Sequence, residues 1–266
     1  MKLPFNKRLE QICSKKNNLL CIGLDPDPEK MPYRQDKSIL GIECFIKDVI
    51  ASTIDFCPVY KPNFAFYERF GSKGYIMLEK IVDFINGRAL VIADAKRGDI
   101  GNSSKQYAIA ILDKMGCDAI TVSPYMGRDT ILPFTNDSSK GVFILGLTSN
   151  ASALEFQGVS SNGVPIYEKV CDLAVEINKN NNIGVVIGAT HNNEVKKLRT
   201  KTQGLSWLIP GIGNQGGDLE HAVKVGNQNG IGIINVSRDI LYAGSGSLND
   251  VINSAHKYTK KIRDLM

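Results

Sequence analysis

The sequence predicts an α/β protein, specifically a (β/α)8 TIM barrel that forms a single domain over residues 1–266. The length of 266 residues suits one such barrel, which typically has about 250 residues. Eight short apolar runs alternate with amphipathic stretches along the chain, which is the strand and helix order of the barrel. A doubly wound open sheet also alternates, but it has a GxGxxG turn after its first strand, and residues 21–27 read CIGLDPD instead.

The eight apolar runs are predicted to be the strands. They are nearly continuous in Val, Ile, Leu, Ala and Phe, which is typical of parallel strands that are buried on both faces. The runs span residues 19–25, 56–61, 89–96, 119–124, 141–148, 183–190, 207–211 and 231–237.

The stretches between these runs are predicted to be amphipathic helices. In the first of them, Ile42, Ile46, Val49 and Ile50 recur at helical spacing. The stretch 102–115 opens on an asparagine, a residue type that caps helix N-termini. The predicted helices span residues 39–54, 75–85, 102–115, 128–134, 164–178, 191–198, 219–226 and 248–265.

Two irregular segments, 26–38 and 148–162, are the longest loops, and each follows a predicted strand. In a barrel, loops that follow strands form the catalytic face. Residues 149–152 and 160–163 are small and polar, as expected of a mobile lid.

The composition argues against several classes of protein. The net charge of +5 comes from scattered lysines, so the chain is not predicted to bind nucleic acid, and a mild positive field suits a small anionic substrate. No apolar run approaches the roughly 18 residues of a membrane-spanning helix. The basic N-terminus lacks the apolar segment of a secretory signal. We therefore expect a cytoplasmic protein that does not bind membranes.

The cysteines and histidines predict neither disulfides nor a metal site. The six cysteines contain no CxxC pair and lie mostly within apolar runs, so they are expected to be reduced thiols of the core. The three histidines show no HxH or HxxxH spacing, so no zinc site is expected.

The most informative segment is 91–102, where an apolar run ends in charges of alternating sign. Side chains two apart on a strand share a face, so Asp94 and Lys96 should project together. Asp99 follows closely enough to be expected to perturb both pKa values, and Lys61 ends the second predicted strand. Because desolvated charges are costly, these four residues are predicted to form a functional site.

Polar residues also follow other predicted strands, and in a barrel all of these positions meet at one rim. They include Asp25, Asn63, Thr148, Ser149, Ser237 and Arg238. The glycine-dense loop 209–218 offers backbone N–H groups to an anion. Arg238, after the last strand, adds a guanidinium that can bind the same anion. Since barrels often hold phosphate at the last two loops, a small phosphorylated substrate is predicted.

Several motifs resemble those of the orotidine 5′-phosphate decarboxylases. DAKRGDIGN at 94–102 is similar to the DxKxxD signature of that family, and KPNFAFYE at 61–68 is similar to the motif of one of its branches. Further similar segments are GLDPD at 23–27, TSN at 148–150, PGIG with QGGD between 210 and 218, and NVSR at 235–238. Departures from the family pattern are small and occur at Ser103, Ala151 and Asn214.

The resemblance implies conversion of orotidine 5′-monophosphate to uridine 5′-monophosphate (UMP) and CO2, the last step of UMP biosynthesis, without metal or organic cofactor. It implies that Lys96 stabilises and protonates a carbanion at C6 of the pyrimidine. Asp94 would lie against the departing carboxylate and disfavour the bound ground state. Lys61 and Asp99 would hold the charges rigid before the carbanion develops.

The resemblance also implies a homodimer whose active sites cross the interface, with Asp99 and Ser103 serving the pocket of the partner. Asp25 and Asn63 would contact the ribose or its surroundings, and Ser149 would read the pyrimidine edge. Gln215 and Arg238 would bind the phosphate. The other substrate-binding residues that it implies are Thr148, Pro210, Gly217 and Ser237.

Three other functions remain open from the sequence. A hexulose-phosphate synthase or ketogulonate-phosphate decarboxylase has a similar strand motif but uses Mg2+, so its activity would not survive EDTA. A Schiff-base aldolase would use Lys96 or Lys61 and would be trapped by borohydride. A barrel that only binds nucleotides would be expected to lack one of the four charged residues.

Overall fold

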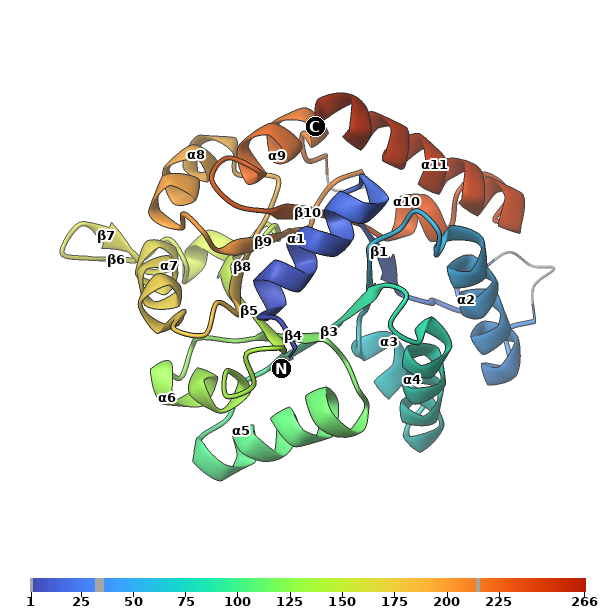
Figure 1. Cartoon of the computed structure of the whole chain (residues 1–266), viewed down its shortest axis with the longest axis horizontal. Coiled ribbons are helices and arrows are strands. Elements are labelled where there is room, and N and C mark those ends of the chain that lie inside the picture. Colours follow the sequence, from blue (N-terminus) through green and yellow to red (C-terminus); the bar gives the residue numbers. More distant parts are fainter. Residues whose placement is uncertain (1, 32–35, 214–215) are drawn as a thin grey trace.

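The computed structural model describes residues 2–31, 36–213 and 216–266 and is a closed barrel of parallel strands surrounded by helices (Figure 1). The strand order around the barrel is β1, β2, β3, β4, β5, β8, β9, β10, with β10 pairing back to β1. The predicted (β/α)8 barrel is therefore confirmed.

All eight predicted strands are present, although several end earlier than expected. The last residues of these predicted strands lie outside the sheet, in the loops that form the rim. The strands are β1 Leu20–Leu24, β2 Val59–Pro62, β3 Leu90–Arg97, β4 Ala119–Val122, β5 Gly141–Leu147, β8 Ile183–Ile187, β9 Ser206–Ile209 and β10 Gly232–Val236.

Each predicted helical stretch contains a helix. They are α2 Ile39–Thr53, α4 Ser72–Ile85, α5 Gly101–Ala108, α6 Arg128–Ile131, α7 Ile166–Ile177, α8 Asn192–Lys201, α9 Leu219–Gly226 and α11 Leu248–Leu265. Two of these stretches change helix type along their length. A π-helix, Ile109–Lys114, continues α5, and a 3-10 turn, Leu132–Phe134, continues α6, where Pro133 lacks the N–H that an α-helical bond needs.

The expectation that Asn102 caps the helix after β3 was wrong. The N-cap position is Ile100, and Asn102 lies inside the first turn of α5. Its Oδ1 accepts a hydrogen bond from Gln106 Nε2 at 3.3 Å. Gly101, the first residue of α5, has φ of +46°, a left-handed conformation that glycine adopts at little cost.

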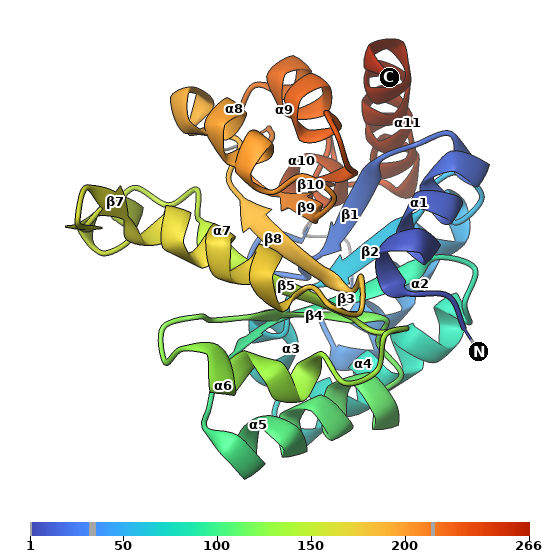
Figure 2. The same ribbon diagram turned by 60° about the vertical axis from the view of Figure 1, so that its left-hand side comes forward.

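Five elements were not predicted from the sequence. They are α1 Phe5–Lys16, α3 Ala65–Glu68, the 3-10 turn Ala153–Glu155, the hairpin of β6 Ser160–Ser161 with β7 Val164–Pro165, and α10 Arg238–Leu241. The hairpin includes residues 160–163, which were expected to belong to a lid. It projects from the side of the molecule near α7 (Figure 2).

Helix α1 lies across the end of the barrel at which the strands begin (Figure 1). The Phe5 amide donates to Ser138 O at 2.8 Å, just before β5. Asn6 Nδ2 donates to Ile183 O at 3.0 Å, at the start of β8. The Phe5 ring packs edge-on against Phe143, with centroids 5.8 Å apart. This helix closes one end of the barrel, so the opposite rim is left for a site.

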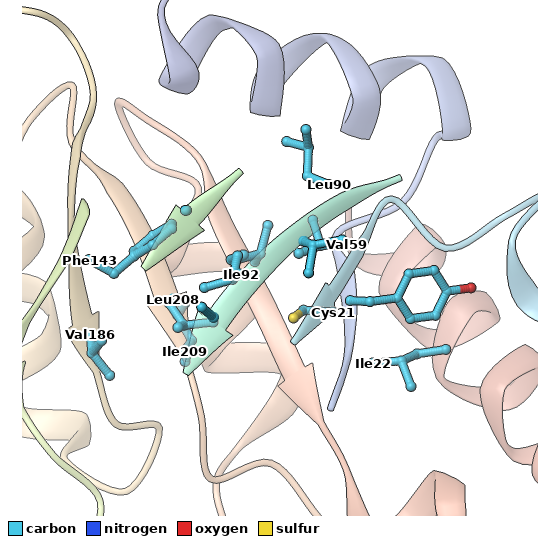
Figure 3. Close-up of a cluster of buried hydrophobic side chains, with 14 of the residues drawn as sticks. Cys21, Ile22, Val59, Leu90, Ile92, Phe143, Val186, Leu208 and Ile209 are labelled. Atoms are coloured by element: carbon cyan, nitrogen blue, oxygen red, sulfur yellow. The ribbon is translucent and has the colours of Figure 1, made fainter. Parts of the chain in front are cut away.

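The core combines side chains of the strands and of the surrounding helices, and Figure 3 shows some of the strand side chains, including those of Cys21, Ile22, Val59 and Ile92. As predicted, the cysteines are free thiols, and five are buried, while Cys44 is exposed. Burial raises the pKa of Cys57 to about 11. Within the described residues, no helix is long and apolar enough to cross a membrane.

Candidate active site

The structure brings Lys61, Asp94 and Lys96 together at the carboxyl ends of β2 and β3. Lys61 Nζ lies 2.7 Å from Asp94 Oδ2, and Lys96 Nζ lies 2.5 Å from Asp94 Oδ1. The Lys61 side chain is 5% exposed and that of Asp94 is 12% exposed, whereas that of Lys96 is 49% exposed. One carboxylate is thus held between a buried ammonium and an accessible one.

The end of β3 does not follow the regular strand geometry assumed from the sequence. Lys96 has φ of +46°, and the pairing of β3 with β4 shifts register between Ala93 and Arg97. A lysine in the left-handed region is strained by roughly 1–2 kcal/mol, and such strain clusters at functional sites. Asp94 and Lys96 therefore meet because of an irregularity in the strand, and strand alternation alone does not account for it.

The two lysines determine the charge state of Asp94. Burial by itself would raise the pKa of Asp94, but Lys61 and Lys96 more than offset this and hold the pKa well below its ordinary value. Burial alone would lower the pKa of Lys61, but Asp94 and then Asp25 more than offset it, so the pKa is raised. These two shifts favour an ionised Asp94 and a protonated Lys61 at neutral pH.

Asp99 and Ser103 are not part of this cluster within one chain. The Asp99 carboxylate accepts a hydrogen bond from the Ile100 amide at 2.8 Å, and Ser103 is exposed in the first turn of α5. The largest causes of the Asp94 pKa shift are burial and the two lysines, and Asp99 is not among them. The chain turns between Arg97 and α5, and the Asp99 carboxylate binds the amide next to it.

Asp25 and Ser237 line a cavity of about 110 Å3 beside the cluster. Asp25 Oδ1 and Ser237 Oγ are buried and lack a hydrogen-bond partner within the described residues. Buried polar atoms normally have partners, so these two atoms are suited to a polar ligand. The other lining residues are Pro210, Gly211, Ile212, Asn235, Arg238 and Asp239.

Two backbone amides of the glycine-dense loop after β9 donate hydrogen bonds to carbonyl oxygens of the same loop, so they are not free to bind an anion. The Gly217 amide donates to Gly211 O at 3.0 Å, and the Gly216 amide donates to Gly213 O at 2.7 Å. A Cβ at Gly217 would lie 2.6 Å from Gly211 O, so the loop needs glycine there. Asn214 and Gln215 lie outside the described residues. Arg238 is exposed at the start of α10 and lines the cavity.

Asn63 and Ser149 lie at the same rim. Asn63 forms an isolated bridge with Asp94, and its side-chain oxygen accepts from the Ala65 amide at 3.3 Å. Ser149 lies against Gly188, where an added Cβ would be 2.9 Å from the Ser149 Cα. Both residues therefore lie beside strand ends, and the Asn63 side chain is hydrogen-bonded there.

Two residues that no sequence motif indicated, Gln157 and His191, hold Thr148. Gln157 accepts from the Thr148 amide at 2.9 Å and donates to its hydroxyl oxygen at 2.8 Å. A ring nitrogen of His191 lies 2.8 Å from Thr148 O. A glutamine in a loop and an isolated histidine match no motif spacing, so only the folded structure reveals this clamp.

Residues of the 61–68 segment hold Arg97 beside the charged cluster. Arg97 Nη2 donates to the Glu68 carboxylate. The guanidinium lies 5.8 Å from the Phe64 ring centroid and 5.4 Å from that of Tyr107. These contacts tie α3 and α5 to the end of β3, so this motif supports the position of the charged strand end.

Comparisons of the sequence with known proteins point to the family whose motifs supply this charged cluster. The family described as "Orotidine 5'-phosphate decarboxylase / HUMPS family" matches residues 18–249. A relative from Dehalococcoides mccartyi (strain CBDB1), named orotidine 5'-phosphate decarboxylase, is 45% identical over 98% of this chain and 97% of its own. One of the same name from Herpetosiphon aurantiacus is 40% identical over 91% of each chain.

Solved structures that resemble this fold are also orotidine-monophosphate decarboxylases by name. A putative orotidine-monophosphate-decarboxylase from Toxoplasma gondii superposes with a TM-score of 0.90 and 32% identity, covering 98% of this chain and 96% of its own. The OMP decarboxylase of Leishmania donovani superposes with a TM-score of 0.86 and 31% identity, covering 99% and 98%. This chain belongs to the orotidine 5′-phosphate decarboxylase / HUMPS family.

Proposed function

We propose that this chain, acting as one barrel domain over residues 1–266, converts orotidine 5′-monophosphate to UMP and CO2, the last step of UMP biosynthesis. The observation that supports the proposal most strongly is the Asp94 carboxylate held between the ammonium groups of Lys61 and Lys96. The family match and the names of the curated relatives favour this reaction over others that a barrel could host.

Lys96 is proposed as the catalytic proton donor. Loss of CO2 leaves an electron pair at C6 of the pyrimidine, in the plane of the ring, where the ring cannot delocalise it well. An ammonium next to C6 stabilises this charge and then transfers a proton to the carbon. Lys96 suits the role because its ammonium is the accessible one of the two that bind Asp94.

Asp94 and Lys61 are proposed to set the field at that carbon before the charge develops. The substrate carboxylate would bind near Asp94, which disfavours the ground state, and departure of neutral CO2 removes the repulsion. Lys61 is buried and fixes Asp94 from the neighbouring strand. Groups held in place in this way need no reorganisation during the reaction.

The rest of the rim is proposed to bind the nucleotide. Arg238 and Gln215 would hold the phosphate, and binding energy at this remote group can orient the reacting carbon. Asp25 and Asn63 would contact the ribose or its surroundings, and Ser149 would read the pyrimidine edge. The remaining substrate contacts are proposed at Thr148, Pro210, Gly217 and Ser237.

The active unit is proposed to be a homodimer in which Asp99 and Ser103 reach the pocket of the partner. Large apolar side chains are exposed near Asp99, with Ile100 at 63% and Tyr125 at 87%. The loop that carries Tyr125 lies against the turn before Asp99, because an added Cβ at Gly98 would be 3.3 Å from Ser123 O. Exposed apolar surface of this kind is typical of protein interfaces.

The proposal is tested by the ultraviolet absorbance change when the protein is mixed with orotidine 5′-monophosphate in the presence of EDTA. Turnover in EDTA is expected. Absence of turnover with this substrate would contradict the proposal, and activity that requires Mg2+ and a sugar phosphate would instead support a hexulose-phosphate synthase or ketogulonate-phosphate decarboxylase. A cytoplasmic location also fits a nucleotide substrate and is tested by cell fractionation.

A further inference from the structure

Thr121, on β4, connects the backbone of Lys96 to the carboxylate of Asp94. Its hydroxyl oxygen accepts a hydrogen bond from the Lys96 amide at 2.9 Å. The same hydroxyl donates to Asp94 Oδ1 at 3.1 Å. Thr121 itself is 1% exposed. The Thr121 hydroxyl accepts from the Lys96 amide and has a single proton, which it donates to Asp94. The two hydrogen bonds therefore run in one direction, from the Lys96 amide through Thr121 to the Asp94 carboxylate.

Thr121 lies where the backbone is irregular. The register between β3 and β4 shifts between Ala93 and Arg97, so this segment is outside the regular ladder. The Lys96 amide donates to a side chain there, and Lys96 has φ of +46°. A hydrogen bond to that amide favours the left-handed conformation over a relaxed strand, in which the lysine side chain would project differently.

The other two donors to Asp94 are long and flexible. Lys61 and Lys96 approach separate oxygens of the carboxylate, and an ammonium group imposes little direction on its hydrogen bonds. The threonine hydroxyl is short and stiff at χ1. It is therefore the partner best able to fix the orientation of the carboxylate plane.

We propose that Thr121 is a positioning residue that holds Asp94 and Lys96 in the arrangement needed for turnover. This inference rests on the proposed decarboxylase function and extends it to a residue that need not touch the substrate. Its loss should therefore affect the chemical step more than substrate binding, because misplacing reacting groups by about an ångström can cost roughly a hundredfold in rate.

The test compares Thr121→Val, which keeps the shape and removes the hydroxyl, with Thr121→Ser, which keeps the hydroxyl. With orotidine 5′-monophosphate in EDTA, Thr121→Val should lower kcat by at least about tenfold, equivalent to ~1.4 kcal/mol. KM and the affinity for UMP should change less than about threefold, since uniform binding is retained. Thr121→Ser should recover most of kcat.

Thr202→Val is the matched control. Thr202 is also buried, and its hydroxyl also donates once and accepts once, to Leu198 O at 2.8 Å and from Trp207 Nε1 at 2.9 Å. It lies before β9, at the end of the barrel opposite to the charged cluster. Thr202→Val should lower the thermal unfolding midpoint and leave kcat at the wild-type value.

The outcomes separate this inference from the proposed function. Wild-type kcat in Thr121→Val, an equal loss of kcat in Thr202→Val, or no recovery in Thr121→Ser would each overturn the positioning role. Absence of turnover by the wild-type protein would overturn the proposed function, and the inference with it. If Thr121→Val does not fold, Thr121→Ala removes the same hydroxyl without inserting a branched apolar group and is judged by the same kcat and KM values.

Discussion

Lys61 Nζ lies 2.7 Å from Asp94 Oδ2 across the pair of β2 and β3, and both side chains are nearly excluded from solvent. Removing one member of a buried ion pair leaves the other charge uncompensated, which typically costs about 3–5 kcal/mol. Asp25 is a further carboxylate that acts on Lys61. The cluster therefore contributes to stability as well as to the proposed chemistry.

Asp94→Asn should lower the free energy of unfolding by about 3 kcal/mol at pH 7, and the difference from wild type should shrink in acid. The folded-state pKa of Asp94 is lowered, whereas an unfolded aspartate has a pKa of about 3.9. The stabilisation is thus present above about pH 3.9 and is lost as pH falls through the folded-state value. Urea unfolding from pH 7 to pH 3 measures the difference, and a difference that stays constant over this range would contradict the assignment.

Lys96→Ala should lower kcat by more than about a hundredfold, or ~2.7 kcal/mol, because the variant lacks the proposed proton donor. Absorbance assays with orotidine 5′-monophosphate measure it. Lys224→Ala is the matched control, since Lys224 is also about half exposed and is paired with a carboxylate, that of Glu220 at 2.6 Å. It should keep wild-type kcat. A Lys96→Ala variant with more than about a hundredth of wild-type kcat would rule out the role.

The strands were predictable from the sequence because each is a continuous apolar run, buried on both sides. Helix α1 was missed because its buried face is narrow and lies in a stretch rich in polar residues, although Phe5, Leu9 and Cys13 recur at every fourth position. Helix α10, at Arg238–Leu241, is too short to show a helical period. Periodicity therefore predicts the elements with wide buried surfaces, and it misses helices whose buried face is narrow or that have too few residues to show a period.

The charged residues of the candidate site were predictable for a different reason. Lys61, Asp94 and Lys96 are unusual at the ends of apolar runs, whereas Thr121 is an ordinary residue of a buried strand and gives no signal. The left-handed backbone at Lys96 also has no signal, since lysine is not typical of that conformation. The sequence thus identifies charged residues that are costly to bury. The neutral residues that orient them can be identified only from their contacts in the folded structure.

Arg238→Ala should lower kcat/KM for orotidine 5′-monophosphate by roughly 10- to 100-fold, the value of a charged hydrogen bond of about 1.5–3 kcal/mol. The loss arises because Arg238, at the rim cavity, is proposed to bind the phosphate. Orotidine, which lacks the phosphate, is the internal control. Wild type and variant should have the same kcat/KM for it, and an equal loss for both substrates would place Arg238 elsewhere in the mechanism.

Mixing two inactive variants tests whether the active site is shared between subunits. Lys96→Ala should lack the proton donor of its own pocket, and Asp99→Ala should lack the carboxylate that is proposed to serve the pocket of the partner. A heterodimer of the two has one pocket with both residues intact and one with neither. If subunits reassort at random, half of the dimers are heterodimers, so the mixture should recover about a quarter of wild-type activity. Activity is measured after exchange, against each variant incubated alone. If Asp99 acts within its own chain, every pocket in the mixture stays defective, and no recovery is observed.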